Sequence, residues 1–337
     1  MTRYVGRLAP SPTGALHLGN VRTFMIAWLR ARSRGGKVIF RMEDLDHPKD
    51  KPGAAAQAVE DLRWLGFDWD EEYVQSERKA IYREALEALK KGHETEDGRR
   101  ESWVYPCVCS RRDVESAQSA PHAGEQMFYP GTCRGRFKSW DAARSFLEGA
   151  SDSRGSRSSR DSSVSRTPCW RFKVPEGARV AFDDAFAGHY EQDVSRTLGD
   201  FPLARDEFGA GYTLACTVDD LLMGVTEVVR GDDLLAATPA QILLARALRG
   251  CRTLDLRRET PGYCHVPLVV GKDGKRLAKR HGDTRIATFR AEGHRPEEIL
   301  GLLAASCGWA ERGERVSLAD LVPRFDLGTI PHGPFMV

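Results

Sequence analysis

The chain has 337 residues, of which 41% are hydrophobic and 29% charged, a composition typical of a globular protein with a substantial core. A formal net charge of +2 does not by itself indicate a nucleic-acid-binding protein. The longest apolar stretches are far shorter than a membrane span and the first residues lack a signal-peptide core, so we expect a cytoplasmic protein without membrane association. The eight cysteines are spread along the chain, which excludes a small disulfide scaffold and favours reduced thiols or a metal site.

The first part of the chain alternates between predicted strands and helices. Tyr4 to Ala9 predicts a short buried strand, and residues 21–34 predict a helix with Asn20 as its N-cap. A strand at 37–42 and helices near 53–65 and 76–91 follow. This rhythm predicts an α/β fold with a parallel, doubly wound sheet.

The middle of the chain interrupts this alternation. Residues 105–135 are rich in Cys, Pro, Gly and Arg, and the Ser/Arg-rich segment 150–167 is expected to form a mobile loop. Strands are predicted at 170–174 and 179–184, and the alternation returns through 212–231, a helix at 239–248 and a strand at 265–270. The last 60 residues predict helices, with an apolar face supplied by Ile299, Leu300, Leu302, Leu303 and Trp309.

The loop after the first strand has the composition of a phosphate site. A strand that turns through small residues into a helix leaves backbone N–H groups free to bind phosphate. Gly14 and Gly19 permit close approach, and His17 is placed to meet the phosphate. A turn shaped by Pro10 and Pro12, with a surface histidine, explains the same residues equally well.

Residues 7–20, RLAPSPTGALHLGN, strongly resemble the "HIGH" signature of class I aminoacyl-tRNA synthetases, with His17 to Asn20 as the motif. Residues 7–14 resemble the glutamyl branch of that family. The resemblance implies a Rossmann-like class I catalytic core that activates glutamate with ATP and Mg²⁺. It places ATP at His17, Gly19 and Asn20, and glutamate at Arg7 and Ser11.

Two later segments resemble the same family. In RMEDLD, residues 41–46, the resemblance places Glu43 against the amino acid; without it, capping of the next turn is the commoner role for such a carboxylate. In residues 211–241 the resemblance places Tyr212 and Arg230 at the substrate. An arginine fork suits a dicarboxylic amino acid, whereas Arg230 alone would be a structural ion-pair partner of Asp232 or Asp233.

The segment GKDGKRLAKRHG, residues 271–282, resembles the "KMSKS" loop that binds ATP. Arg276 and Lys279 then contact the nucleotide, and Lys279 acts with His17 as a catalytic residue. Arg276 replaces the first lysine of the motif and Ala278 its serine, from which we expect altered loop dynamics but retained activity. Taken alone, the segment is an ordinary solvated basic hairpin.

Three cysteines have the spacing of a zinc site. Cys107 and Cys109 are separated by one residue and Cys133 follows later, so a fourth ligand would complete a tetrahedron around Zn²⁺. By ligand chemistry alone His122 is the favoured fourth ligand. Resemblance to the zinc site of glutamyl-Q tRNA(Asp) synthetases implies Tyr129 instead, with one structural zinc. The other five cysteines lie in apolar or helical stretches and are expected to be structural.

These resemblances together define the expected domains. Residues 1–104 and 191–283 form the two halves of the catalytic core, 105–190 an inserted zinc-binding subdomain of the acceptor type, and 284–337 a helical C-terminal part. Because the chain ends soon after the KMSKS-like loop, we expect no anticodon-binding domain.

The function implied by the resemblance is tRNA-independent activation of glutamate and its transfer to the queuosine base in the anticodon of tRNA(Asp). The expected partners are ATP, L-glutamate and tRNA(Asp), and the protein is expected to be a monomer. The alternatives are a truncated glutamyl-tRNA synthetase that charges a tRNA 3′ end, and a non-catalytic RNA-binding paralogue.

Overall fold

The structure is a computed structural model that describes residues 3–45, 51–116, 128–152, 166–207, 209–251, 259–274, 277 and 284–337. None of the helices in these ranges has the length and hydrophobicity that spanning a bilayer requires.

The strands are β1 (Val5–Leu8), β2 (Lys37–Met42), β3 (Glu71–Val74), β4 (His93–Glu94), β5 (Arg100–Glu101), β6 (Val104–Cys107), β7 (Cys169–Phe172), β8 (Arg179–Asp184), β9 (Gly188–Asp193), β10 (Phe201–Ala204), β11 (Glu227–Gly231), β12 (Gly262–Val266), β13 (Val269–Val270) and β14 (Phe335–Met336). The α-helices are α1 (Leu18–Arg32), α2 (Ala54–Trp64), α3 (Lys79–Lys91), α4 (Arg111–Ser116), α5 (Trp140–Asp152), α6 (Val194–Thr197), α7 (Tyr212–Leu222), α8 (Thr238–Gly250), α9 (Ile286–Ala291), α10 (Pro296–Ala305) and α11 (Leu318–Leu321).

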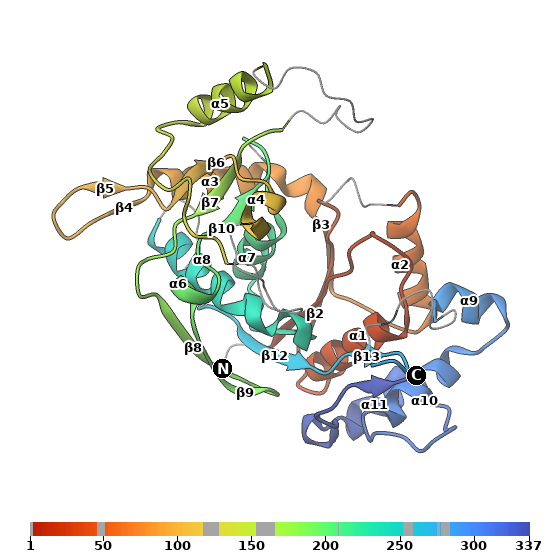
Figure 1. Ribbon diagram of the computed structural model, residues 1–337. Coiled ribbons are helices and arrows are strands. Elements are labelled where there is room, and N and C mark those ends of the chain that lie inside the picture. The colour runs from red at the N-terminus through yellow and green to blue at the C-terminus, as the bar shows by residue number, and fades with distance from the viewer. Residues whose placement is uncertain are drawn as a thin grey trace.

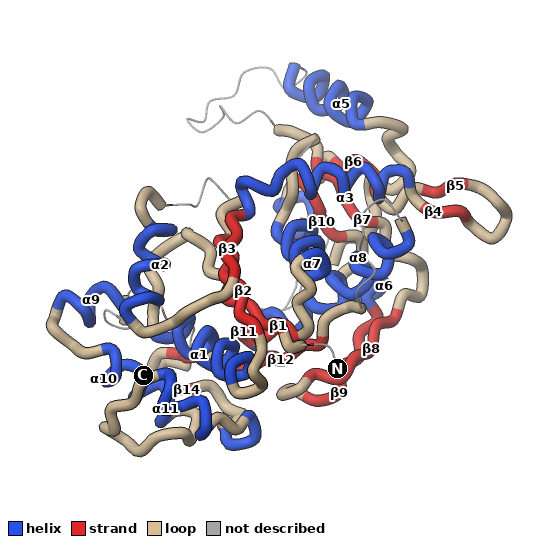
Figure 2. The backbone as a smooth tube through the Cα atoms, turned by 180° about the vertical axis from the view of Figure 1, so that it is seen from behind, coloured by secondary structure: helices blue, strands red, loops and turns tan. Residues whose placement is uncertain are grey.

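Parallel strands from two distant parts of the chain form the centre of the molecule (Figure 1). β1, β2 and β3 pair in parallel, and β11 and β12 pair in parallel, as the alternating sequence predicted. The two groups adjoin at β1 and β11, where the Thr226 amide donates to the Val5 carbonyl at 2.9 Å. Figure 2 shows β2, β1, β11 and β12 together from behind.

The first helix begins earlier than the sequence predicted. Its N-cap is His17 and not Asn20, because the His17 Nδ1 accepts a hydrogen bond from the Gly19 amide at 3.1 Å. The Asn20 side chain in turn accepts from the His17 amide at 3.3 Å. This reciprocal capping box satisfies amides that would otherwise lack partners in the first helical turn.

The strand predicted at 265–270 is divided into β12 and β13. Pro267 lies between them, and a proline has no N–H to donate to a ladder. β13 pairs in parallel with β14, so the C-terminal part is not helical throughout. Most of its predicted apolar face packs into the core, but Leu302 is 40% exposed and was assigned wrongly to that face.

The middle of the chain forms an antiparallel sheet in the order β10–β7–β6. Tyr105, Cys107, Val114, Tyr129 and Cys133 form a small buried cluster beside this sheet. Helix α5 continues to Asp152, so the start of the Ser/Arg segment is helical and not a loop; residues 153–165 of that segment lie outside the described residues. The helix lies at the end of the molecule opposite α10 and α11 (Figure 1).

Candidate active site and metal site

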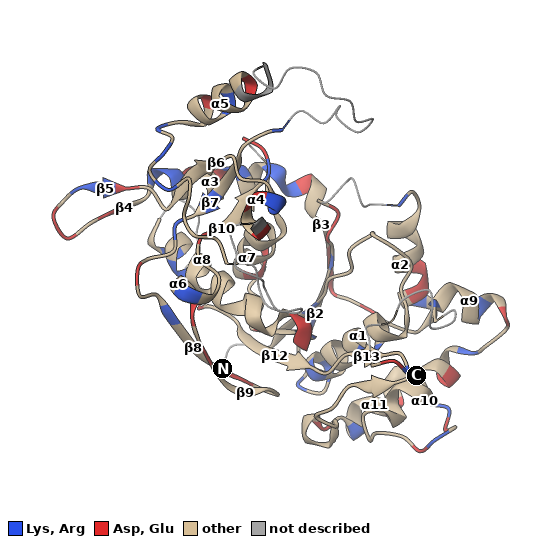
Figure 3. Cartoon of the chain, viewed as in Figure 1, with Lys and Arg blue, Asp and Glu red and all other residues tan. Residues whose placement is uncertain are grey.

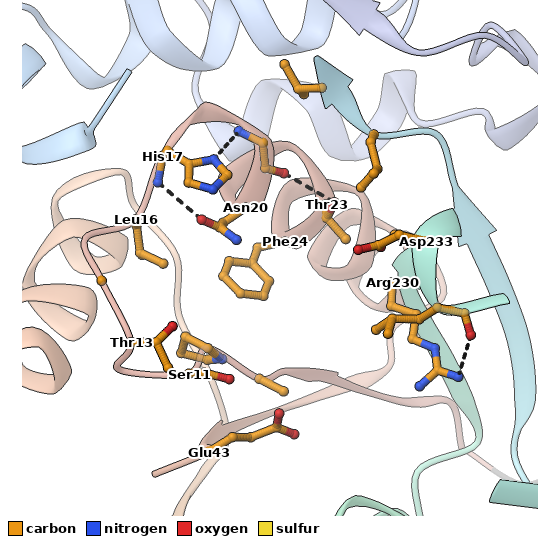
Figure 4. A pocket seen from close by; sticks show the side chains of 18 of the residues that line it. Ser11, Thr13, Leu16, His17, Asn20, Thr23, Phe24, Glu43, Arg230 and Asp233 are labelled. Carbon is orange, nitrogen blue, oxygen red and sulfur yellow. Dashed lines mark hydrogen bonds between the residues drawn. The ribbon is translucent and has the colours of Figure 1, made fainter. Parts of the chain in front are cut away.

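A cavity of about 460 Å³ lies where the loop after β1, the start of α1 and the end of β11 meet. Seven predicted site residues line it: Ser11, His17, Gly19, Asn20, Glu43, Tyr212 and Arg230. Figure 4 shows Asn20, Glu43 and Arg230 around a common space, although they come from different elements. Arg7 is not among the lining residues; it is buried beside β11, where its Nη1 donates to the Val229 carbonyl at 2.7 Å.

The start of α1 presents His17 to the cavity in a defined tautomer. Because the Gly19 amide donates to Nδ1, a neutral imidazole carries its proton on Nε2 and uses that nitrogen as a donor. A Cβ on Gly19 would lie 3.0 Å from the His17 ring, so a larger residue there would displace the ring from its capping position. Gly14 has open space around it, and crowding does not explain that glycine.

Glu43 is oriented by the fully buried Arg41 of β2. Arg41 donates from Nη2 to Glu43 Oε1 at 2.9 Å and from Nη1 to Asp220 at 2.7 Å. Although burial disfavours its charge, Asp220 and Glu43 raise the pKa of Arg41 well above its usual value. Glu43 therefore lines the cavity as a carboxylate held by Arg41.

A buried thiol also contacts Glu43, and this contact was not predicted from the sequence. The Cys216 Sγ donates to Glu43 Oε1 at 3.1 Å. Burial, reinforced by the Glu43 charge, raises the pKa of the Cys216 thiol well above its usual value, so the thiol keeps its proton. Arg41 and Cys216 both donate to Oε1 of Glu43, so the second carboxylate oxygen is the one that remains for a ligand.

Arg230 is buried, yet it has no carboxylate partner in the part of the chain that the structure describes. Its Nε donates to His265 Nε2 at 3.0 Å and its Nη2 to the Thr238 hydroxyl at 2.7 Å. The predicted alternative, an ion pair with Asp232 or Asp233, does not form. Burying an arginine without a countercharge is costly, which favours a site that receives an anion.

Arg7 adds a second incompletely paired guanidinium. Its Nε is buried without a hydrogen-bond partner, and the nearest ion-pair contact, to Asp220, is 3.8 Å long. Tyr212, at the start of α7, is 44% exposed and lines the cavity. The predicted ATP residues Arg276 and Lys279, and also Ala278, lie outside the described residues.

The three predicted metal-ligating cysteines lie together. The sulfur atoms of Cys107, Cys109 and Cys133 are all within 4.8 Å of one another, and this group has the composition of a metal site. The Tyr129 hydroxyl lies 3.2 Å from the Cys107 sulfur and 3.7 Å from the Cys109 sulfur. It also accepts a hydrogen bond from the Cys133 amide at 2.9 Å. His122, the alternative fourth ligand, lies outside the described residues.

Two residues of β7 also contact this cluster, which the sequence did not predict. Cys169 is the register partner of Cys107 across the β6–β7 pair. Arg171 donates from Nε to the Cys107 sulfur at 3.2 Å, and its guanidinium lies 3.8 Å from the centre of the Tyr129 ring. Hydrogen bonds from Cys133 and Cys169 lower the pKa of the Cys107 thiol, which favours a thiolate able to bind a metal.

The family model for class I tRNA synthetases (E and Q), catalytic domain, matches residues 4–321 of the chain. The chain therefore belongs to the class I glutamyl- and glutaminyl-tRNA synthetase family. This result confirms the resemblance inferred from the HIGH-like and KMSKS-like segments and the expected α/β catalytic core.

The chain is also similar to individual proteins of this family. The chain is 43% identical to the glutamyl-Q tRNA(Asp) synthetase of Symbiobacterium thermophilum, covering 98% of this chain and 95% of the relative. It is also 43% identical to that of Rhodopirellula baltica, covering 100% of this chain and 97% of the relative. A crystal structure of a glutamate tRNA ligase from Elizabethkingia meningosepticum in complex with its amino acid is 26% identical, with a TM-score of 0.75, covering 99% of this chain and 67% of that one.

Proposed function

We propose that the protein activates glutamate with ATP to glutamyl-adenylate and transfers the glutamyl group to the queuosine base in the anticodon of tRNA(Asp). The structural observation that carries this proposal is the cavity that combines Arg230, buried without a carboxylate partner, with the held carboxylate of Glu43. Identity of 43% to two glutamyl-Q tRNA(Asp) synthetases supports the choice within the family.

The charges of the cavity match a dicarboxylic amino acid. Glu43 offers its second oxygen to the ammonium group of glutamate, while Arg230, with Arg7 nearby, receives carboxylate charge. Ser11 and Tyr212 offer hydroxyl groups on the same walls. A site with this combination of fixed charges selects glutamate over amino acids with uncharged side chains.

Activation requires positioning and charge neutralisation more than acid–base chemistry. A carboxylate oxygen of glutamate attacks the α-phosphorus of ATP, forming a C–O–P linkage, while the bond to the departing pyrophosphate breaks. His17 and the N-terminus of α1 line the cavity, where they stabilise the phosphate charge in this proposal. Mg²⁺ bound to ATP, and Lys279 and Arg276 of the KMSKS-like loop, neutralise the triphosphate in this proposal.

Basic side chains outside the cavity support the assignment of a tRNA substrate. Arg111 and Arg112 on α4, and Arg136, are exposed. Figure 3 shows blue segments, which mark Lys and Arg, on α4. Arg111 forms an exposed ion pair with Glu115, and such pairs exchange readily for phosphate because they contribute little stability.

We propose that Cys107, Cys109, Cys133 and Tyr129 bind one structural Zn²⁺. The close thiols and the hydroxyl that contacts two of them fit a four-coordinate site. Cys109→Ala is expected to lose the metal, measured as zinc per protein by mass spectrometry. Retention of zinc by Tyr129→Phe together with its loss in His122→Ala would assign the fourth position to His122, and loss in Cys169→Ala would assign it to Cys169.

The proposed function is tested by two assays on the same preparation. Pyrophosphate exchange with glutamate in the absence of tRNA should proceed, and labelled glutamate should then transfer to tRNA(Asp) that contains queuosine. Matched tRNA(Asp) without queuosine is the control and should accept nothing. Equal labelling of both tRNAs, or labelling of tRNA(Glu), would instead indicate charging of the 3′ end, and no exchange at all would indicate a non-catalytic protein.

A further inference from the structure

Three adjacent strands place a row of polar side chains behind the cavity. In the parallel pair β11–β12, Arg230 is the register partner of His265. β12 in turn pairs with β8, whose last residue is Asp184. Arg230 reaches the cavity wall, whereas His265 and Asp184 are buried and do not line it.

The hydrogen bonds in this row allow only one arrangement of protons. A guanidinium has no acceptor, so the His265 Nε2 that lies 3.0 Å from Arg230 Nε must accept. The imidazole proton is then on Nδ1, which donates to Asp184 Oδ2 at 2.6 Å. Burial lowers the pKa of His265 below its usual value despite this bond to Asp184, which keeps the ring neutral.

Asp184 is itself anchored by the backbone. Its Oδ1 accepts from the amides of Phe186 at 3.0 Å and Ala187 at 2.8 Å, and from that of His265 at 3.0 Å. Burial alone would raise the pKa of Asp184, but the hydrogen bonds to its carboxylate lower that pKa to about 2. The carboxylate therefore fixes the histidine, and the histidine fixes the arginine.

The row orients Arg230 without neutralising it. A carboxylate in direct contact would pair with the guanidinium and compete with an anionic ligand. The neutral imidazole accepts the Nε–H, and the Thr238 hydroxyl, which also lies 3.1 Å from His265 Nε2, accepts one N–H of Nη2. Nη1 has no hydrogen-bond partner among the described residues. It is therefore available to bind the ligand.

We propose that His265 and Asp184 are positioning residues that hold Arg230 correctly oriented for a carboxylate of the amino-acid substrate. The identity of that substrate as glutamate rests on the function proposed above. His265 and Asp184 touch neither substrate nor reacting atoms; they act through Arg230.

The first test measures the tautomer and needs no activity. In protein labelled with ¹⁵N in its nine histidines, the His265 signals are identified by their disappearance in His265→Asn. A neutral ring protonated at Nδ1 is expected at pH 7. A ring protonated at Nε2, or at both nitrogens, would overturn the hydrogen-bond row.

The second test uses two variants that each keep one of the two bonds. The amide of asparagine occupies approximately the place of Nδ1 and keeps the bond to Asp184, whereas the oxygen of glutamine reaches approximately the place of Nε2 and keeps the bond to Arg230. We expect His265→Asn to raise the KM for glutamate about 10- to 100-fold in pyrophosphate exchange, since a hydrogen bond to a charged group is lost. The KM for ATP should change less than about twofold.

His265→Gln should recover most of the affinity for glutamate, and His294→Asn, at an exposed histidine, is the control. A merely structural role would lower stability in both His265 variants and change both KM values alike, which would overturn the proposal. Wild-type protein that does not activate glutamate would refute the proposed function, while the tautomer measurement would still decide whether the row exists.

Discussion

Amino-acid selectivity should depend on Arg230. Arg230 is only 5% exposed and has no carboxylate partner among the described residues, so a ligand carboxylate would supply the missing countercharge. Breaking a buried charge pair by removing one partner costs about 3–5 kcal/mol. We therefore expect glutamine, whose amide replaces a carboxylate, to be activated with a kcat/KM lower by about 10²- to 10⁴-fold.

Arg230→Ala removes the arginine from the same proposed charge pair. It should lower the kcat/KM for glutamate by a similar factor, because the glutamate carboxylate then has no buried cation to pair with. The assay is pyrophosphate exchange with each amino acid over a range of concentrations. Arg30→Ala is the matched control, since Arg30 is another partly buried arginine that pairs with Glu227 outside the cavity at 2.7 Å. Comparable rates with glutamine, or an Arg230→Ala protein that activates glutamate normally, would refute the reasoning.

Two further predictions concern stability. Arg41→Met leaves the buried carboxylate of Glu43 without its arginine partner and Asp220 with only the 3.8 Å contact to Arg7, so the free energy of unfolding in urea should fall by about 3–5 kcal/mol. An unchanged value would show that the cluster does not stabilise the fold. The pKa of Asp184 is lowered to about 2 in the folded protein. Compared with about 3.9 in the unfolded chain, this carboxylate contributes about 2 kcal/mol at neutral pH, which is lost as the pH falls from about 4 to about 2. Asp184→Asn should flatten the stability curve over that interval, and an identical curve would contradict this assignment.

Local hydrophobic patterns were sufficient to predict the bounds of some of the secondary-structure elements. Strand β2 has the predicted bounds, as does β8, because their hydrophobic runs end at turn residues. The predicted start of α1 was wrong because Asn20 has a residue type that is preferred at N-caps, whereas His17 has not. The hydrogen bond from the Gly19 amide to the His17 ring depends on side-chain geometry, which residue type does not reveal.

Some residues of the candidate site could be predicted from local sequence patterns, and others could not. Glu43 and Arg230 lie in segments that resemble family signatures, so the sequence identified them before the fold was known. His265 and Asp184 are 81 residues apart, and Cys216 and Glu43 are 173 apart. No local pattern links such pairs, because only the tertiary packing of strands and helices brings them into contact. Cys169 was assigned as structural for the same reason: its contact with Cys107 depends on the β6–β7 register.

The charge of the proposed zinc site predicts a function for Arg171. Three thiolates and a phenolate outweigh the two positive charges of Zn²⁺, which leaves a net negative charge in a buried place. Arg171 is 7% exposed and contacts both the Cys107 sulfur and the Tyr129 ring, where it offsets that charge. Arg171→Met should therefore weaken zinc binding about 10- to 100-fold in competition with a chelating dye. Arg171→Lys should recover part of the loss because it keeps the charge, and Arg111→Met, at an exposed arginine of α4, should change nothing. Unchanged affinity in Arg171→Met would contradict this function of Arg171.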